Sequence, residues 1–145
     1  MPTTEELLAS VPLFADLDER ELSYLAKVTA IRDYKNGDVI LKEGDPGVAF
    51  FIILSGEVEV VKGIGSESLR VLATLGTEHY FGELALLGHF VRTASVVAKR
   101  ETQCLALPAW EFTATIKSNV DIAVKMLTAL SRRLMMTDQA IMEIG

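Results

Sequence analysis

Residues 81–96 read Phe-Gly-Glu-Leu-Ala-Leu-Leu-Gly-His-Phe-Val-Arg-Thr-Ala-Ser-Val, and their only Lys or Arg is Arg92. An arginine in such apolar surroundings requires an anion partner. Gly82 lets the backbone come close to a ligand, because it has no side chain. Residues 83–87 are a helix-forming run whose first N–H groups are free to bind an anion. The stretch therefore predicts an anion site in which Arg92 clamps the anion and Glu83 accepts hydrogen bonds from sugar hydroxyls.

The glycines of the chain are concentrated around this stretch. Nine of the ten glycines lie between residues 37 and 88, whereas residues 1–36 and 89–144 contain none. Glycine-containing turns between short apolar segments are typical of strands. We therefore expect an antiparallel β-roll in the middle of the chain and helices at both ends. The predicted strands cover residues 39–42, 48–54, 57–60, 69–75, 92–98 and 103–107.

The first clear helix is predicted to begin directly after Asp18. Asp18 is a favourable N-cap residue, and Glu21, three residues later, completes a capping box. Leu17 and Leu22 stand on either side of the cap, where they form a hydrophobic staple. We expect this helix to run to about Ala30.

The C-terminal segment carries the most regular apolar pattern of the sequence, a heptad seam. Its length suits a helix that packs against its copy in a second chain, although an amphipathic helix lying on its own roll produces the same stripe. The one polar member of the seam either fixes the register or contacts a polar group. Methionines on this helix suit a surface that repacks between two states, and also ordinary core filling. The seam comprises Val120, Ala123, Leu127, Leu130, Leu134, Thr137, Ile141 and Ile144.

Length, composition and charge bound the class of protein. The chain has 145 residues, 50% hydrophobic and 23% charged, which is the balance of one compact domain. Its net charge of −6 repels a nucleic-acid backbone. No apolar run approaches the roughly 20 residues of a membrane helix, and the acidic N-terminus is unlike a secretory signal. We therefore expect no membrane span and no direct nucleic-acid contact. The chain has a single cysteine, Cys104, so we expect no internal disulfide and a cytoplasmic location.

Metal-dependent or nucleophilic chemistry is not indicated by the sequence. His79 and His89 stand ten residues apart with no cysteine or histidine at ligand spacing. Cys104 fits the interior of a strand rather than a nucleophile. Trp110 and Phe112 are interpreted as core anchors at the start of a helix. A metal-dependent enzyme built on a β-roll is therefore the disfavoured alternative.

Residues 81–87, followed five positions later by Arg-Thr-Ala, resemble the phosphate-binding cassette of cyclic-nucleotide-binding domains. This family includes regulatory subunits of cyclic-AMP-dependent kinase, the cyclic-GMP-dependent kinase, nucleotide-gated channels and the bacterial catabolite activator. The resemblance covers essentially the whole chain. The spacing of the barrel glycines of the family is similar to that in residues 35–40, 43–45 and 51–58. Its N-terminal entry is similar to residues 11–17, and its C-terminal helix to residues 131–134.

The resemblance implies a mainly β fold: an eight-stranded antiparallel β-roll with N-terminal helices, a short phosphate-binding helix and C-terminal helices. It also implies that the chain is a single domain. Its expected parts are an N-terminal helical part at residues 1–30, the β-roll at 31–108 with the cassette at 81–96, and C-terminal helices at 109–145.

The resemblance also implies roles for the residues of the cassette. It assigns Arg92 to the cyclic phosphate and Glu83 to the ribose 2′-hydroxyl. Backbone contacts are implied for Gly82, Leu84 and Ala85. No catalytic residue and no catalytic cofactor are implied, so the expected ligand is the cyclic nucleotide itself.

The base of that nucleotide is left open by the sequence. Thr137 falls where the catabolite activator places a threonine against the adenine amino group, and Asp138 where that protein has a serine reaching the other subunit's ligand. Thr93 stands where cyclic-GMP readers have a threonine that bonds the guanine amino group. The proline that frequently precedes the arginine is Val91 here. We favour cyclic AMP, because bacterial-looking members mostly bind it, and keep cyclic GMP as the alternative.

The sequence thus predicts a regulatory cyclic-nucleotide sensor rather than an enzyme. We expect the phosphate to draw the cassette and Arg92 together, the C-terminal helix to close over the base, and the heptad seam to change its packing. The expected partners are a second copy of the chain through that helix and an unidentified effector, since no effector domain follows Gly145. The alternative is an interaction or dimerisation module of the same fold that has lost its ligand, although Glu83 and Arg92 argue against it.

Overall fold

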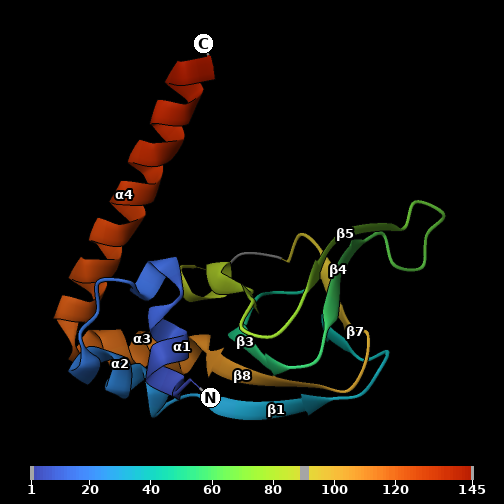
Figure 1. The fold of residues 1–145 in the computed structure, drawn as a ribbon, viewed down its shortest axis with the longest axis horizontal. Coiled ribbons are helices and arrows are strands. Elements are labelled where there is room, and N and C mark those ends of the chain that lie inside the picture. The colour runs from blue at the N-terminus through green and yellow to red at the C-terminus, as the bar shows by residue number, and fades with distance from the viewer. Residues whose placement is uncertain (1, 89–91, 145) are drawn as a thin grey trace. The chain divides into compact units, whose positions relative to one another are not determined.

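The computed structural model describes residues 2–88 and 92–144. Within these residues the chain forms two four-stranded antiparallel sheets, ordered β1-β8-β3-β6 and β2-β7-β4-β5 (Figure 1). The predicted eight-stranded β-roll with flanking helices is confirmed. The strands are β1 (Ala30–Tyr34), β2 (Val39–Leu41), β3 (Ala49–Ser55), β4 (Val58–Lys62), β5 (Arg70–Leu75), β6 (Tyr80–Phe81), β7 (Ser95–Ala98) and β8 (Thr102–Pro108).

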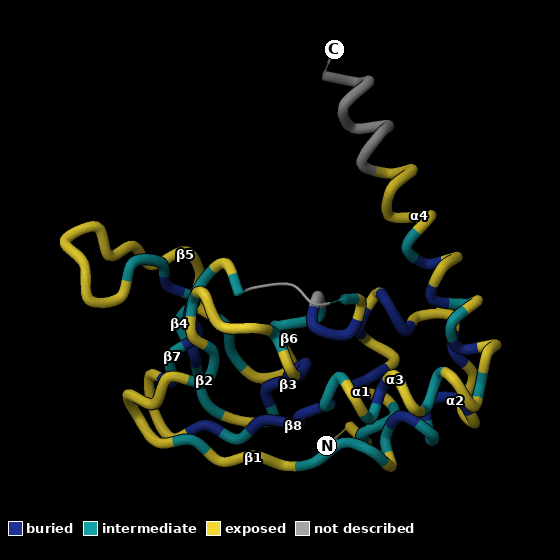
Figure 2. The backbone as a smooth tube through the Cα atoms, turned by 180° about the vertical axis from the view of Figure 1, so that it is seen from behind, coloured by how far each residue is buried: buried dark blue, intermediate teal, exposed yellow. Residues whose placement is uncertain are grey.

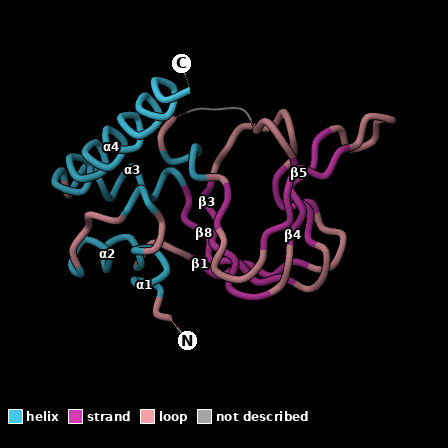
Figure 3. The backbone as a smooth tube through the Cα atoms, turned by 45° about the horizontal axis from the view of Figure 1, so that its top comes forward, coloured by secondary structure: helices cyan, strands magenta, loops and turns pink. Residues whose placement is uncertain are grey.

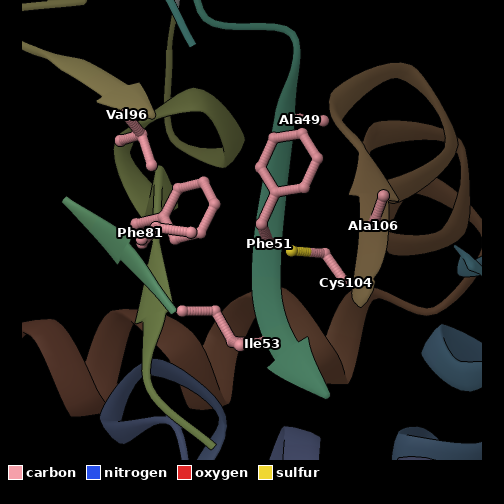
Figure 4. Packing of buried hydrophobic residues seen from close by; sticks show 8 residues of the cluster. Ala49, Phe51, Ile53, Phe81, Val96, Cys104 and Ala106 are labelled. Atoms are coloured by element: carbon pink, nitrogen blue, oxygen red, sulfur yellow. The ribbon is translucent and has the colours of Figure 1, made fainter. Parts of the chain in front are cut away.

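Residues 28–112 form one compact unit, which contains the β-roll. Figure 3 shows β3 and β8 in one layer of the roll and β4 and β5 in the other. The central strand β3 pairs with both β8 and β6, and five consecutive residues of it are buried. Between the sheets, the rings of Phe51 and Phe81 stack with their centroids 5.1 Å apart (Figure 4). This apolar cluster, which also contains Cys104, forms the core of the roll.

Two short strands were missed by the sequence pattern, and one predicted strand begins later than expected. β1 carries no alternation of buried and exposed residues, and β6 has only two residues, so neither produces a period-two signal. The strand predicted at 92–98 starts at Ser95. The backbone of Arg92 is instead bonded to the turn at residues 44–45, which keeps it out of the sheet ladder.

Residues 1–27 and 113–145 form a second compact unit of helices. Its helices are α1 (Thr4–Ala9), the 3-10 turn η1 (Pro12–Phe14), α2 (Glu19–Ala26) and α4 (Val120–Ile144), and α3 (Ala109–Ser118) connects the two units. None of the helices in the described part of the chain is long and apolar enough to span a bilayer.

The predicted capping box at the start of α2 is present. The Glu21 N–H donates to Asp18 Oδ1 (2.8 Å), and the Asp18 N–H donates to Glu21 Oε1 (2.9 Å). The predicted end of this helix at Ala30 is wrong, because α2 ends at Ala26. Residues 28–31 include three β-branched side chains, which favour extended backbone, and Ala30 begins β1.

The aromatic residues at the start of α3 lie in different environments. Phe112 is 1% exposed and is a core anchor, as predicted. Trp110 is 71% exposed, so its interpretation as a core anchor is wrong. Residues two apart on a helix point to nearly opposite sides, and only one of the pair faces the interior.

The face of α4 that packs against the rest of its unit is not the face that carries the heptad seam. Its buried residues are Ile122, Met126 and Ala129, whereas the seam residues Leu127 and Leu134 are 64% and 65% exposed. Figure 2 shows buried, intermediate and exposed stretches alternating along the described part of α4. Three ion pairs flank the buried side. Lys125 Nζ donates to Glu21 Oε1 (2.5 Å) and lies 3.7 Å from Asp18 Oδ2, and Arg132 Nη2 donates to Asp16 Oδ2 (2.9 Å). Among the seam residues whose burial is described, Val120, Leu127 and Leu134 are exposed, and Ala123 and Leu130 are half-buried.

Candidate ligand-binding site

A cavity of about 270 Å³ opens into the β-roll beside the segment that the sequence singled out. Strands β2, β4 and β7 of one sheet supply apolar side chains to it, and β6 supplies an aromatic ring. Gly82, Glu83, Ala85 and residues 92–94 complete the lining and include its polar side chains. It is lined by Leu41, Val60, Phe81, Gly82, Glu83, Ala85, Arg92, Thr93, Ala94 and Val96.

Arg92 is fixed in this cavity by its backbone and by one end of its side chain. The Arg92 N–H donates to the Asp45 carbonyl, and the Arg92 carbonyl accepts from the Gly44 N–H, both at 2.8 Å. Nη2 donates to the Ala49 carbonyl at 2.6 Å. The turn before β3 and the first residue of β3 thus position the guanidinium.

The rest of the guanidinium lacks an anionic partner. Nε is buried without a hydrogen bond, and Arg92 makes no ion pair within residues 2–88 and 92–144. Burial of the side chain lowers the pKa of Arg92, because the apolar surroundings disfavour the charged form. A half-buried cation in this state is suited to receive an anion.

Gly82 and the short turn that follows it place the backbone of the site. Gly82 has a φ of +81°, a left-handed conformation that favours glycine. The predicted helix over residues 83–87 is instead a single 3-10 turn, η2 (Glu83–Leu86), and its Ala85 N–H donates to the Gly82 carbonyl at 3.1 Å. A helical macrodipole is therefore not the source of anion affinity here, because one turn aligns too few peptide groups.

The structure brings five of the eight predicted site residues to one cavity: Gly82, Glu83, Ala85, Arg92 and Thr93. Leu84 lies in η2, but its side chain is outside the described residues, as are those of Thr137 and Asp138 near the end of α4. His89 and Val91 also lie outside the described residues.

Sequence reasoning missed the residues that hold Arg92 from the other side. Gly44, Asp45, Gly47 and Ala49 belong to a Gly-Asp-Pro-Gly turn and the strand after it, more than 40 residues before Arg92. Nothing in one sequence connects this turn to a distant arginine.

The site and the roll core offer little for metal or thiol chemistry. No cluster of three metal-ligating side chains occurs in the part of the chain that the structure describes. Cys104 is fully buried, and burial raises its pKa to about 12, because the thiolate loses its hydration. The thiol is therefore protonated near neutral pH and inert as a nucleophile.

Comparison with known proteins finds relatives in both sequence and structure. The sequence model of the family called cyclic nucleotide-binding domain matches residues 31–119 of the chain. The cGMP-dependent protein kinase egl-4 of Caenorhabditis briggsae is 40% identical over 111 residues, which are 75% of this chain and 15% of that kinase.

Two solved structures show the same fold over nearly the whole chain. The N-terminal domain of a transcriptional regulator from Streptomyces coelicolor A3(2) superposes with a TM-score of 0.84 at 30% identity, covering 93% of this chain and 94% of that one. The regulatory domain of Toxoplasma gondii PKA, crystallised with cAMP, gives a TM-score of 0.74 at 30% identity over 91% of this chain and 47% of that one. The chain spans less than a third of the length of the curated relatives it matches.

Proposed function

The chain belongs to the cyclic nucleotide-binding domain family, and we propose that it is a regulatory module that binds one cyclic nucleotide in the cavity beside Arg92. The observation that carries the proposal is the half-buried guanidinium of Arg92, which has no anionic partner within the described residues. An unpaired buried charge is unfavourable for folding, and such groups concentrate at functional sites. The anionic phosphate of a cyclic nucleotide supplies the missing partner. We propose no catalytic step for this site.

The residues around Arg92 divide the recognition of the nucleotide. Glu83 lines the same cavity and accepts hydrogen bonds from the ribose 2′-hydroxyl in our proposal. The backbone at Gly82, Leu84 and Ala85 contacts the phosphate and the sugar. Apolar side chains from β2, β4, β6 and β7 line the rest of the cavity, which favours a partly apolar ligand.

The identity of the base is the finer part of the proposal. Thr93 is exposed at the rim of the cavity, where its hydroxyl is available to a guanine amino group. Relatives of both kinds are present: one is a cGMP-dependent kinase, and another was crystallised with cAMP. We propose cyclic AMP as the ligand and cyclic GMP as the alternative. Thr137 and Asp138 stay proposed contacts to the base.

Calorimetric titration of the purified chain with cyclic AMP and, in parallel, cyclic GMP tests the function. We expect micromolar or tighter binding of one of them, and the ratio of the two affinities identifies the base. If folded and ligand-free protein binds neither, the proposal fails. The alternative, an interaction module of this fold without a ligand, then takes its place.

We also propose that the heptad seam of α4 joins two copies of the chain. The seam is continuous over the described residues, and Val120, Leu127 and Leu134 are each more than 60% exposed. A seam with heptad spacing is complementary to a second copy of itself, because apolar residues of one helix insert between those of the other.

Sedimentation over a range of concentrations, with and without ligand, checks the dimer. We expect a concentration-dependent dimer, and Leu127→Glu should shift it to monomer, since it places a carboxylate in the apolar seam. Thr128→Glu is the matched control, because Thr128 is exposed on the same helix outside the seam and should leave the dimer intact. A monomer at high concentration in both ligand states contradicts the proposal.

The regulatory output is proposed to pass through the same helix. Ligand binding draws residues 82–85 and Arg92 together, α4 closes over the base, and the seam changes its packing. The ligand shifts the population of molecules from the open arrangement of α4 to the closed one, because it binds the closed one more tightly. The effector is proposed to be a partner protein or a further domain of a longer protein, as the share of each relative that the chain covers suggests.

A further inference from the structure

Gly47 lies against the guanidinium of Arg92, although the two residues are 45 positions apart. A Cβ at Gly47 would stand 3.0 Å from Arg92 Cζ and 3.1 Å from Nε. Favourable contacts between carbon atoms begin near 3.5 Å, so a methyl group does not fit without displacing the guanidinium. The backbone of Gly47 is not in the left-handed region, which means that space, rather than φ, explains the glycine.

A second glycine confines the same group. A Cβ at Gly82 would stand 2.9 Å from Nη1 and 3.3 Å from Nη2 of Arg92. The guanidinium therefore packs directly against the backbone of Gly47 and Gly82, and its Nη2 donates to the Ala49 carbonyl. Gly82 needs to be glycine for its φ of +81° as well, whereas Gly47 has no such requirement.

We propose that Gly47 is a positioning residue for ligand binding, because its missing side chain leaves room for the guanidinium of Arg92. A methyl carbon 3.0 Å from Cζ and 3.1 Å from Nε would require the guanidinium to move from the position in which Nη2 donates to the Ala49 carbonyl. The inference rests on the proposed function, since it concerns how Arg92 is presented to the phosphate.

Gly47→Ala and Gly76→Ala are the matched pair that tests the inference. Neither glycine has a left-handed φ, and a Cβ at Gly76 would have no heavy atom within 4 Å. Both substitutions reduce the freedom of the unfolded chain equally. We expect Gly47→Ala to weaken cyclic-nucleotide binding by tenfold or more in calorimetry, and Gly76→Ala to bind as the unaltered protein does.

A double-mutant cycle separates positioning of Arg92 from a general disturbance of the site. The methyl group that Gly47→Ala introduces would also lie 3.1 Å from the Ala85 Cβ, which offers a second route to lost affinity. If Gly47 acts through Arg92, then Gly47→Ala changes affinity less than twofold when added to Arg92→Ala. An undiminished loss in the Arg92→Ala background, or unaltered binding by Gly47→Ala alone, overturns the inference.

A measurement without ligand keeps the inference distinct from the proposed function. The ¹⁵N–¹H resonance of Arg92 Nε, assigned by its absence in Arg92→Ala, should shift in Gly47→Ala and stay in place in Gly76→Ala. If no cyclic nucleotide binds but the resonance shifts, the function fails and the positioning role stands. If Gly47→Ala does not fold, recovery of the fold in Gly47→Ala/Arg92→Ala supports the clash with Arg92, and failure of both variants to fold contradicts it.

Discussion

Arg92→Ala is expected to lower the affinity for the cyclic nucleotide by more than tenfold, a loss of at least about 1.4 kcal/mol. The alanine leaves the phosphate charge without a partner inside an apolar cavity, where a charge-assisted hydrogen bond contributes about 1.5–3 kcal/mol. Nothing else in the cavity lining carries a positive charge within the described residues, so no neighbour substitutes for Arg92. Calorimetric titration of the variant measures the loss directly.

Arg100→Ala is the matched control for this variant. Arg100 belongs to the same β-roll unit but lies on the surface, where its Nη2 meets Glu57 Oε2 at 3.3 Å with the Arg100 side chain 65% exposed. Exposed ion pairs contribute about 0–1 kcal/mol to stability, and this one is not part of the cavity lining. We expect Arg100→Ala to bind as the unaltered protein does. Unchanged affinity in Arg92→Ala would remove the guanidinium from the proposed site.

The fold, and the meeting of residues 82, 83, 85, 92 and 93 at one cavity, were predictable because local signals coincide there with the tertiary structure. The Asp18 and Glu21 capping box fixes the start of α2 through bonds between residues three apart. Glycines, short apolar segments and a lone Arg92 are likewise visible within short windows of sequence. The family resemblance added the count of eight strands, which the periodicity did not supply.

Contacts between distant segments were not predictable from the same signals. The guanidinium of Arg92 lies next to Gly47 and donates to the Ala49 carbonyl. These residues are far from Arg92 in the sequence and come close to it only in the folded roll. Helix α4 shows a related difficulty, because it has two apolar faces. The regular seam through Leu127 dominates the pattern, but the less regular stripe through Ile122 and Met126 is the face that is buried. Periodicity identifies an apolar face without saying which partner covers it.

Gly56→Ala is expected to destabilise the protein by about 3–5 kcal/mol, at the upper end of single substitutions. Gly56 turns the chain from β3 to β4 with a φ of +102°, and a Cβ there would lie 2.5 Å from Thr102 Oγ1 and 2.7 Å from both Thr102 Cα and the Glu101 carbonyl oxygen. Two of these three atoms belong to backbone and cannot rotate away. Thr102 is 1% exposed and its hydroxyl donates to the Arg100 carbonyl at 2.9 Å, so the start of β8 has to move with it.

Gly37→Ala isolates the cost of the clash from the cost of the backbone conformation. Gly37 has a similar φ of +92°, but a Cβ there would have no heavy atom within 4 Å. Its alanine variant should therefore lose only the about 1–2 kcal/mol that a left-handed residue costs. In urea unfolding we expect the midpoint to fall much further for Gly56→Ala than for Gly37→Ala, with the m-value unchanged in both. Equal losses would mean that the turn relaxes away from β8, and that its close packing on Thr102 contributes nothing to the stability of the roll.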